Sequence, residues 1–462
     1  MELKIYNSLT RQKQALKPVN NTVHYYFCGP TVYWFQHIGN MRAFFVMDTM
    51  RRAVKYLGYN IVHVMNITDV GHMTSDADEG EDKMEVASKR EQKTPKEIAD
   101  FYWGLCKNDM DSLNIETPEY ICPATSVIDE IIKFVQDILD NGYGYITKNG
   151  VYFDTSKYSN YGKLGNMQQD DKLFGARIEV DQDKKNPADF VLWVIAKDNH
   201  IQKWNSPWGV GYPGWHIECS AIGNKYLGDH IDLHGGGIEH KTVHHENEIA
   251  QNYAKCNHEV VDCWFHLEHL MFDGGKMSKS KGAIYTLNSL KEKGYSPMDL
   301  RLFYLSAHYS KQQNFTFEAL NSAKESYSNL KKLLLKHKNG SNVVEKSVIA
   351  EYENKFASYV ADDINTPLAL SVMWDALKNN ADSKDIYNLV LGFDKFLGLK
   401  LNEVKEEKVE IPNEIIAIAE ERKQARLNKD FATSDILRNK INDLGFVILD
   451  KPGQEYELKP KN

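Results

Sequence analysis

A cysteine and a histidine-rich segment in the middle of the chain carry side chains that could bind a metal ion. Cys219 precedes the run His244-His245-Glu246-Asn247-Glu248, and residues 243–254 contain no Pro or Gly, which predicts a helix. On a helix, His244 and Glu248 are four residues apart and lie on one face, one turn from each other. An imidazole and a carboxylate in this arrangement, joined by a thiolate from elsewhere in the chain, suit Zn²⁺.

The same residue types also have an interpretation without a metal. His244 and Glu248 would then be partners on the surface of one helix, and Cys219 would be a small buried apolar side chain. The local spacing alone leaves both interpretations open.

The composition is that of an ordinary soluble globular protein. The chain has 462 residues, enough for about three domains, with 42% hydrophobic and 26% charged residues. The first 18 residues contain no apolar signal segment. A run of about 18 apolar residues, which a membrane span needs, is also absent from the sequence. We therefore expect a cytoplasmic protein without a membrane partner.

The cysteines and the net charge restrict the class of protein further. The six cysteines form no C-x-x-C pair, which argues against a disulfide framework. The net charge is −8. Because phosphate contacts supply much of the affinity for nucleic acid, a nucleic-acid partner would require locally basic surfaces on this acidic protein.

A strand–helix–strand pattern near the N-terminus predicts a parallel sheet. Residues 22–28 are rich in β-branched and aromatic residues, residues 41–59 have helical periodicity, and a second strand is expected at 61–65. Ligands on such sheets bind beyond the carboxyl ends of the strands. We therefore expect Cys28, which follows the first strand, and His37 to lie at a binding edge.

Two glycine-rich or basic segments could contact phosphates. Residues 209–214 match G-x-G-x-x-G by letter, but Pro213 interrupts the motif and no apolar strand precedes it, which argues against a dinucleotide fingerprint. A strand expected at 263–272 is followed by the sequence KMSKSKG at 276–282. This segment is either a phosphate-binding loop or a solvated basic turn.

The predicted fold class is α/β. We expect a Rossmann-like parallel-sheet catalytic domain with an inserted connective segment, then a C-terminal helical bundle and a small mixed α/β module. The expected divisions are the first half of the catalytic domain (1–117), the insertion (118–200), the second half with the metal site (201–270), the KMSKS loop and stem-contact region (271–315), the bundle (316–410) and the C-terminal module (411–462).

Two separated motifs resemble the signatures of class I aminoacyl-tRNA synthetases. One is His37-Ile38-Gly39-Asn40 after a strand, where that family has H-I-G-H, and the other is KMSKS at 276–280. Five further segments are similar to cysteinyl-tRNA synthetases over nearly the whole chain: FCGPTVY (27–33), NITDVGH (66–72), PGWHIECSA (213–221), DLHGGG (232–237) and HHENEIAQ (244–251).

The resemblance implies one zinc ion per chain. The family binds zinc through two cysteines, a histidine and a glutamate, and the matching positions here are Cys28, Cys219, His244 and Glu248. Cys28 is then the thiolate from elsewhere in the chain. His245 and Glu246 are expected to support the ligands or to pack the helix rather than to bind the metal.

The resemblance also assigns the substrate residues. Catalysis and ATP binding, with Mg²⁺ accompanying ATP, are expected from His37, Asn40, Lys276 and Lys279. The residues expected around the bound cysteine are Gly29, Thr31, Thr68, Trp215 and His234. Asn40 departs from the second histidine of the family motif, and its amide can donate a hydrogen bond but cannot become cationic.

The implied reaction is the ATP-dependent activation of L-cysteine to cysteinyl-adenylate, followed by transfer to the 3′ end of tRNA(Cys). A zinc with an open position favours cysteine over serine, because a thiol binds as a thiolate far more readily than a hydroxyl binds as an alkoxide. We expect the C-terminal helices and residues 411–462 to hold the tRNA, and the protein to be a monomer.

Three other functions are compatible with parts of the sequence. A relative could ligate cysteine to a small amine, but residues 411–462 matter only for tRNA. A zinc- and NAD-dependent dehydrogenase built on residues 209–214 would leave KMSKS unexplained. A catalytically silent zinc-binding RNA module would not need Lys276 and Lys279.

Overall fold

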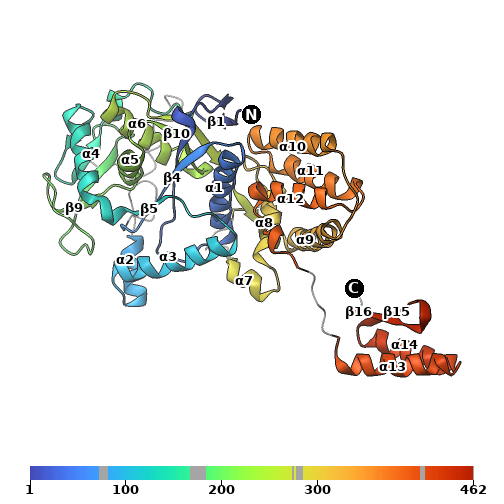
Figure 1. The fold of residues 1–462 in the computed structure, drawn as a ribbon. Coiled ribbons are helices and arrows are strands. Elements are labelled where there is room, and N and C mark those ends of the chain that lie inside the picture. The colour runs from blue at the N-terminus through green and yellow to red at the C-terminus, as the bar shows by residue number, and fades with distance from the viewer. Residues whose placement is uncertain (72–81, 167–183, 273–274, 277–284, 406–410, 461–462) are drawn as a thin grey trace. The chain divides into compact units, whose positions relative to one another are not determined.

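The computed structural model describes residues 1–71, 82–166, 184–272, 275–276, 285–405 and 411–460. The chain divides into two compact units, Met1–Glu403 and Val404–Asn462 (Figure 1). None of the helices in the described ranges combines the length and the apolar character that crossing a membrane requires. The finer domain boundaries expected from the sequence stay predictions.

A parallel sheet forms the centre of the first unit and confirms the predicted fold class. Its strands are β3 (Thr22–Phe27), β4 (Asn60–Ile67), β5 (Tyr120–Pro123), β10 (Ile231–Gly237) and β11 (Val261–Leu267). They lie in the order β11-β10-β3-β4-β5, with every neighbouring pair parallel. Their carboxyl ends therefore share one edge, at which sheets of this kind bind ligands.

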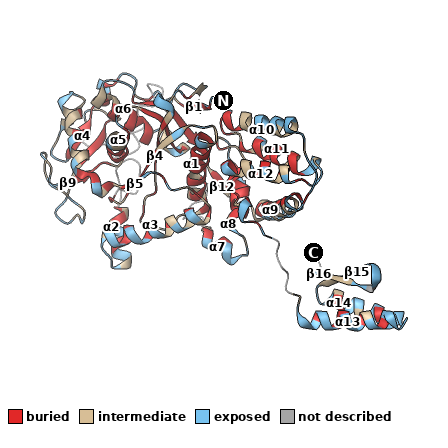
Figure 2. Ribbon diagram, viewed as in Figure 1, coloured by how far each residue is buried: buried red, intermediate tan, exposed pale blue. Residues whose placement is uncertain are grey.

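Helices cover both faces of this sheet because both faces of β3 are apolar. Successive side chains of a strand point to opposite sides. Tyr26 and Cys28 belong to the core that contains Ile217 and Ile222 of α5 (Trp215–Leu227). Tyr25 and Phe27 instead contact the ring of Phe265. Figure 2 shows that the sheet, α1 (Ile38–Tyr56), α5 and α6 (His244–Cys256) consist largely of buried residues.

Smaller elements surround the sheet. A hairpin forms from β1 (Lys4–Asn7) and β2 (Gln12–Ala15), and the helices between and after the first strands are α2 (Lys83–Glu91), α3 (Pro95–Ser112) and α4 (Ile128–Asp140). An antiparallel sheet contains β6 (Gly144–Ile146), β7 (Gly150–Phe153), β8 (Phe190–Ile195) and β9 (Gly211–Pro213), in that order.

The strand predicted at 263–272 is wrong as a single element. The structure has β11, ending at Leu267, and a separate β12 (Leu270–Phe272). Between them, the backbone N–H of Glu268 donates to the carbonyl of Tyr309 (2.9 Å), which draws the chain out of the parallel sheet. β12 then pairs with β13 (Gly275–Lys276) and β14 (Gln313–Phe315) in another sheet.

The remainder of the first unit is mainly helical, as predicted from residue 286 onward. Its helices are α7 (Leu287–Glu292), α8 (Pro297–Leu305), α9 (Phe317–Lys338), α10 (Lys346–Ala361), α11 (Thr366–Asn379) and α12 (Lys384–Leu397). α10 and α12 pack through Phe356 and Phe393, whose rings stack with centroids 4.0 Å apart.

The second unit has its own apolar core. Its elements are α13 (Asn413–Leu427), α14 (Phe431–Asp443), β15 (Phe446–Asp450) and β16 (Tyr456–Pro460), and the two strands pair in an antiparallel hairpin. The core contains Ile415, Ile418, Ile441 and Ile448. A hydrogen bond from the buried Arg422 to Asp450 (2.8 Å) joins the first helix to the hairpin and lowers the pKa of Asp450 to about 2.

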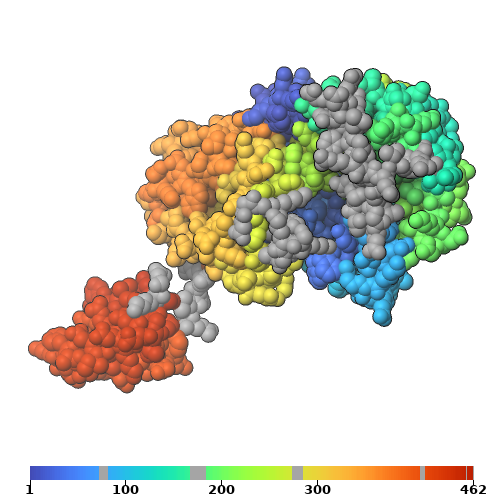
Figure 3. All heavy atoms as spheres, turned by 180° about the vertical axis from the view of Figure 1, so that it is seen from behind, coloured from blue at the N-terminus to red at the C-terminus, as the bar shows by residue number. Residues whose placement is uncertain are grey.

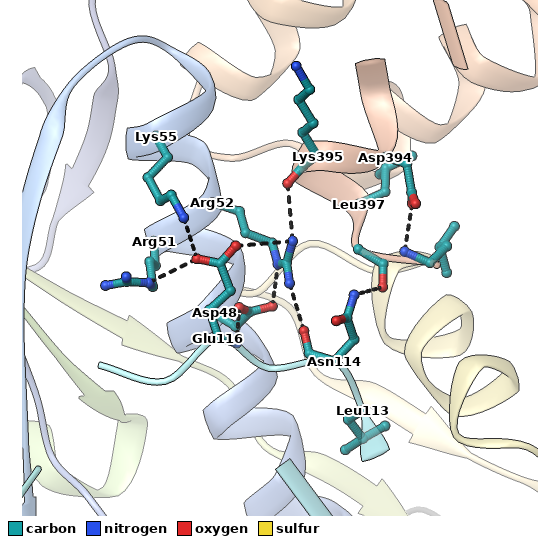
Figure 4. Close-up of polar contacts among 12 residues, drawn as sticks. Asp48, Arg51, Arg52, Lys55, Leu113, Asn114, Glu116, Asp394, Lys395 and Leu397 are labelled. Carbon is teal, nitrogen blue, oxygen red and sulfur yellow. Dashed lines mark hydrogen bonds and ion pairs between the residues drawn. The ribbon is translucent and has the colours of Figure 1, made fainter. Parts of the chain in front are cut away.

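Asp48 of α1 is the centre of a buried ion network that joins the parallel sheet to the helical region (Figure 4). Its carboxylate accepts hydrogen bonds from Arg52 Nε (2.8 Å), Arg301 Nη2 (2.7 Å) and the backbone N–H of Glu116 (2.8 Å). Arg52 donates to the carbonyl of Lys395, and Arg301 donates to that of Leu397. One carboxylate therefore fixes α1, α8 and the end of α12 to one another.

Substituting Asp48 by asparagine should destabilise the first unit by about 3 to 5 kcal/mol, because it leaves the buried Arg301 without its ion-pair partner and removes one of the two carboxylates that pair with Arg52. The loss should be measurable as a lower midpoint of urea unfolding at pH 7. Asp100→Asn is the control, because Asp100 pairs with Lys96 on the exposed face of α3. A midpoint for Asp48→Asn no lower than that of the control would contradict this role.

The difference between wild type and Asp48→Asn should also depend on pH. Burial alone raises the pKa of Asp48, but the charges of Arg52 and Arg301 hold it below the ordinary value of 3.8. The stabilisation is therefore present above that ordinary value and is lost as the pH falls through the lower pKa of the folded protein. The urea midpoints of wild type and Asp48→Asn, measured from pH 7 down to pH 3, should therefore approach each other at the acidic end of this range.

Candidate active site and metal centre

A cavity of about 410 Å³ opens at the carboxyl ends of β3 and β4 and at the start of α1. On the face in Figure 3, blue residues from the first part of the chain lie recessed between the light-blue and the yellow-green segments. Many of the residues predicted for the site line this cavity: Cys28, Gly29, Thr31, His37, Asn40, Thr68, Trp215, Cys219 and His244. Two others, His234 and Glu248, are buried against these residues.

The structure brings the four predicted metal ligands together. Cys28 directly follows β3, Cys219 lies on α5, and His244 and Glu248 lie one turn apart on α6; all four are buried. Their ligand atoms lie within 4.8 Å of one another. The i, i+4 pair on α6 therefore meets thiols from two other elements, at the positions that the family resemblance implies.

The distances within this cluster fit a tetrahedral ion. Donors bound at zinc–ligand distances of 2.0 to 2.3 Å at tetrahedral angles lie about 3.3 to 3.8 Å apart. The Sγ atoms of Cys28 and Cys219 are 3.9 Å apart, and His244 Nε2 is 3.4 Å from Cys219 Sγ and 3.2 Å from Glu248 Oε1. The side chains thus surround a space that an ion the size of zinc would occupy.

The protonation chemistry also favours a cation. Burial raises the pKa of Glu248 well above its ordinary value, and its Oε2 accepts no hydrogen bond from any described residue. Burial also raises the pKa of the Cys28 thiol. A divalent cation would offset the cost of these buried anions, because it supplies the charge that the surrounding side chains lack.

His245 contributes to this cluster more directly than the sequence analysis expected. Its Nε2 is 3.3 Å from Cys28 Sγ, and with His234 and Glu248 it forms a second set of potential ligands around the same cysteine. Its Nδ1 lies 2.8 Å from His266 Nε2. The available signal was its i, i+3 spacing to Glu248, which places both side chains on neighbouring positions of one helix face.

The two histidines beside Cys28 are suited to be neutral ligands or neighbours. Burial lowers the pKa of both His234 and His245 well below the ordinary value, and other imidazoles near them add to this effect. His234 Nε2 is 3.7 Å from Cys28 Sγ, and its ring stacks on Trp264 with centroids 4.3 Å apart. Both rings therefore lie against the cluster without adding positive charge.

The residues predicted around the amino-acid substrate lie on one side of the metal cluster. The N–H of Gly29 donates to Asn66 Oδ1 (2.8 Å), and Asn66 Nδ2 donates to Thr68 Oγ1 (3.0 Å). A Cβ atom on Gly29 would lie 1.8 Å from the carbonyl oxygen of Asn66, so this turn has no room for a side chain. The ring of Trp215 lies 4.6 Å from that of His244, between the cavity and the cluster.

His37 and Asn40 form the cap of α1 at the other side of the cavity. The N–H of Asn40 donates to His37 Nδ1 (3.1 Å), and the N–H of His37 donates to Asn40 Oδ1 (3.3 Å). Because Nδ1 accepts a hydrogen bond, a neutral His37 carries its proton on Nε2. The start of this helix therefore offers its positive dipole end and an imidazole N–H donor, both of which favour a phosphate.

The KMSKS segment lies mostly outside the described residues. The backbone of Lys276 belongs to β13 and pairs with Met271 of β12. Lys279 falls outside the described ranges, so its predicted place at the triphosphate stays a prediction.

The structure rejects the dinucleotide interpretation of residues 209–214. Gly211 begins β9, which pairs antiparallel with β8 instead of ending a strand of the parallel sheet. A Cβ atom on Gly211 would lie 1.9 Å from the carbonyl oxygen of Val194, so close packing of two strands explains this glycine. A dinucleotide site needs a strand of a parallel sheet before its glycines and helix, whereas the strand before α5 here is the antiparallel β9.

Comparisons with known proteins agree with this site. Residues 15–325 match the sequence model described as tRNA synthetases class I (C) catalytic domain. The cysteine–tRNA ligase of Treponema denticola is 39% identical, covering 98% of this chain and 99% of its own. That of Bacteroides fragilis is 39% identical, covering 99% of each chain.

Solved structures support the fold. A methionyl-tRNA synthetase of Mycobacterium tuberculosis, bound by methionyl-adenylate, superposes with a TM-score of 0.56 at 14% identity, covering 89% of this chain and 96% of that one. With the signature motifs, the buried cluster and nearly full-length relatives all in agreement, the chain belongs to the cysteine–tRNA ligase family of class I tRNA synthetases.

Proposed function

We propose that this protein activates L-cysteine with ATP and transfers it to the 3′ end of tRNA(Cys). The observation that carries the proposal is the buried set Cys28, Cys219, His244 and Glu248, which adjoins a cavity also lined by the start of α1. One end of the cavity thus has ligands for a thiol-binding metal, and the other end has donors for a phosphate.

Selection of cysteine would rest on the metal cluster. A bound Zn²⁺ with one open position would bind the thiolate of the substrate in preference to the hydroxyl of serine. The two thiols of the protein, His244 and Glu248 would hold that ion. Gly29 and Thr31 would line the turn beside the substrate, and Thr68, Trp215 and His234 would enclose it.

Activation requires the carboxylate of cysteine to attack the α-phosphorus of ATP, which releases pyrophosphate. Charge accumulates on the phosphoryl oxygens in the transition state, so donors aimed at those oxygens and correct positioning supply most of the catalysis. His37 would donate from Nε2, and the positive end of the α1 dipole would add to its effect. Lys276 and Lys279 would complete the site at the triphosphate, which ATP brings with Mg²⁺.

The tRNA would use surfaces beyond the cavity. The second unit folds around its own core and carries basic residues on α13, such as Lys423 and Arg426. Its presence favours tRNA over a small amine as the acceptor of the cysteinyl group. We propose that residues 411–462 hold the anticodon end of the tRNA, and that a single chain carries the complete catalytic site.

Replacing Cys219 by serine should release the metal and abolish cysteine activation. The loss of a direct ligand should weaken zinc binding by more than the roughly 10- to 100-fold that is typical when a residue supporting a ligand is lost. Zinc content by mass spectrometry and cysteine-dependent ATP–pyrophosphate exchange measure the two effects. Cys256→Ser is the matched control, because Cys256 lies at the far end of α6, the helix that carries His244 and Glu248. Normal exchange by Cys219→Ser would refute the ligand assignment.

Replacing Lys279 by alanine should slow adenylate formation by about 100-fold, as expected for one lost donor to transition-state charge. Zinc content should not change, because the lysine is not a ligand. Exchange kinetics and metal analysis on the same preparation test both statements. Lys291→Ala, an exposed lysine on α7, is the control. An unchanged exchange rate would remove Lys279 from the site.

Deleting residues 411–462 should weaken tRNA charging while sparing adenylate formation. The described part of the first unit has a core separate from the one around Ile415 and Ile441. Aminoacylation and pyrophosphate exchange, measured side by side, separate the two steps. Loss of both activities would show that the boundary at 411 is in the wrong place.

A further inference from the structure

A second group of potential metal ligands lies at the amino ends of β10 and β11. It consists of His230, which precedes β10, Asp232 near the start of β10, and Asp262 near the start of β11. The active-site cavity lies at the opposite, carboxyl ends of the parallel strands. These three residues take no part in the proposed reaction.

Asp232 is an unusual member of this group because it is almost completely buried, with 2% of its side chain exposed. Its Oδ2 accepts a hydrogen bond from the backbone N–H of His24 (2.7 Å). Its Oδ1 has no hydrogen-bond partner anywhere in the part of the chain that the structure describes. A buried carboxylate oxygen without a partner is costly, and such an atom requires an explanation.

An imidazole lies near Oδ1 but is too far away for a hydrogen bond. His230 Nε2 lies 3.7 Å from Asp232 Oδ1 and 3.5 Å from Asp262 Oδ2. Donors held 2.0 to 2.2 Å from one ion at tetrahedral angles are about 3.3 to 3.6 Å apart. The two separations from His230 are close to this range, and all three ligand atoms lie within 4.8 Å of one another, so one ion can bridge the three groups.

The donor set indicates the class of ion. An imidazole with two carboxylates favours Zn²⁺ and other divalent transition metals over Mg²⁺ and Ca²⁺, which prefer oxygen ligands alone. His230 and Asp262 are 43% and 52% exposed, so solvent can reach the site and supply the remaining ligands. The buried Asp232 fixes one side of the site and the exposed pair leaves the other side open.

We propose that His230, Asp232 and Asp262 form a second site for a divalent transition metal, separate from the active-site cluster. The ion links the amino ends of two neighbouring strands and satisfies the buried oxygen of Asp232. β10 continues to His234 and β11 continues to His266, which lies against His245. Binding at this site therefore stabilises the two strands that support the active-site histidines.

A second imidazole–carboxylate pair in this chain lacks the buried carboxylate that distinguishes the proposed site. His258 Nε2 lies 3.6 Å from Asp229 Oδ2, a separation like those around His230. Both side chains are exposed, at 48% and 72%, and the described residues supply no third ligand to this pair. An imidazole–carboxylate pair alone is thus present in the same protein as an internal control.

The test adds Zn²⁺ to the full-length protein already carrying one equivalent of zinc and measures further binding by calorimetry. Wild type should bind a second equivalent and show a higher midpoint of thermal unfolding in its presence. His230→Ala and Asp262→Asn should each weaken this second binding at least tenfold, whereas His258→Ala should leave it unchanged. Both substitutions are at exposed positions, so the fold should be retained.

Cys219→Ser should still bind zinc at the second site, because that site shares no ligand with the active-site cluster. The proposal is overturned if wild type binds no second equivalent, since His230 would then be only an ion-pair partner of the two carboxylates. It is equally overturned if His230→Ala retains the second equivalent, or if His258→Ala loses it to the same extent.

Discussion

The burial of Glu248 among thiols and neutral imidazoles is the constraint on which the rest of the site depends. A carboxylate at this depth is costly unless a cation or several donors compensate it. The described surroundings of Glu248 offer two cysteines and three histidines, His234, His244 and His245. Burial lowers the pKa values of His234 and His245. A metal held by these residues would compensate the ionised form of the site, and the proposed selection of cysteine depends on that ion.

The parallel sheet makes this arrangement feasible with few residues. β3 is central, and its neighbour β10 brings His234 level with Tyr26, two residues before Cys28. α5 and α6 pack on the same face and supply Cys219, His244 and Glu248. The opposite end of the cavity is set by α1, which begins directly after the turn that follows β3. One crossing point of strands and helices therefore positions the potential metal ligands and the start of α1 together.

The sequence predicts those parts of the site that depend on local periodicity. The strand at 22–27, the helix that follows His37 and the i, i+4 pair on α6 are all confirmed, because each reflects the repeat of one element. Contacts between distant elements have no such signal: Cys28 joined the cluster through family resemblance, and the approach of His245 to Cys28 was missed. The break between β11 and β12 depends on Tyr309, which is equally remote in sequence.

Asn40 shows how a departure from a motif can keep the geometry that the chemistry needs. Its side-chain oxygen accepts from the N–H of His37, and its own N–H donates to His37 Nδ1. The second of these bonds comes from the backbone, so any residue at this position except proline could make it. It fixes the proton of a neutral His37 on Nε2, the atom that faces the phosphate in the proposed reaction. Asn40 therefore preserves the tautomer of His37 and the helix cap, and the positive charge at this end of the cavity must come from lysines and from the helix itself.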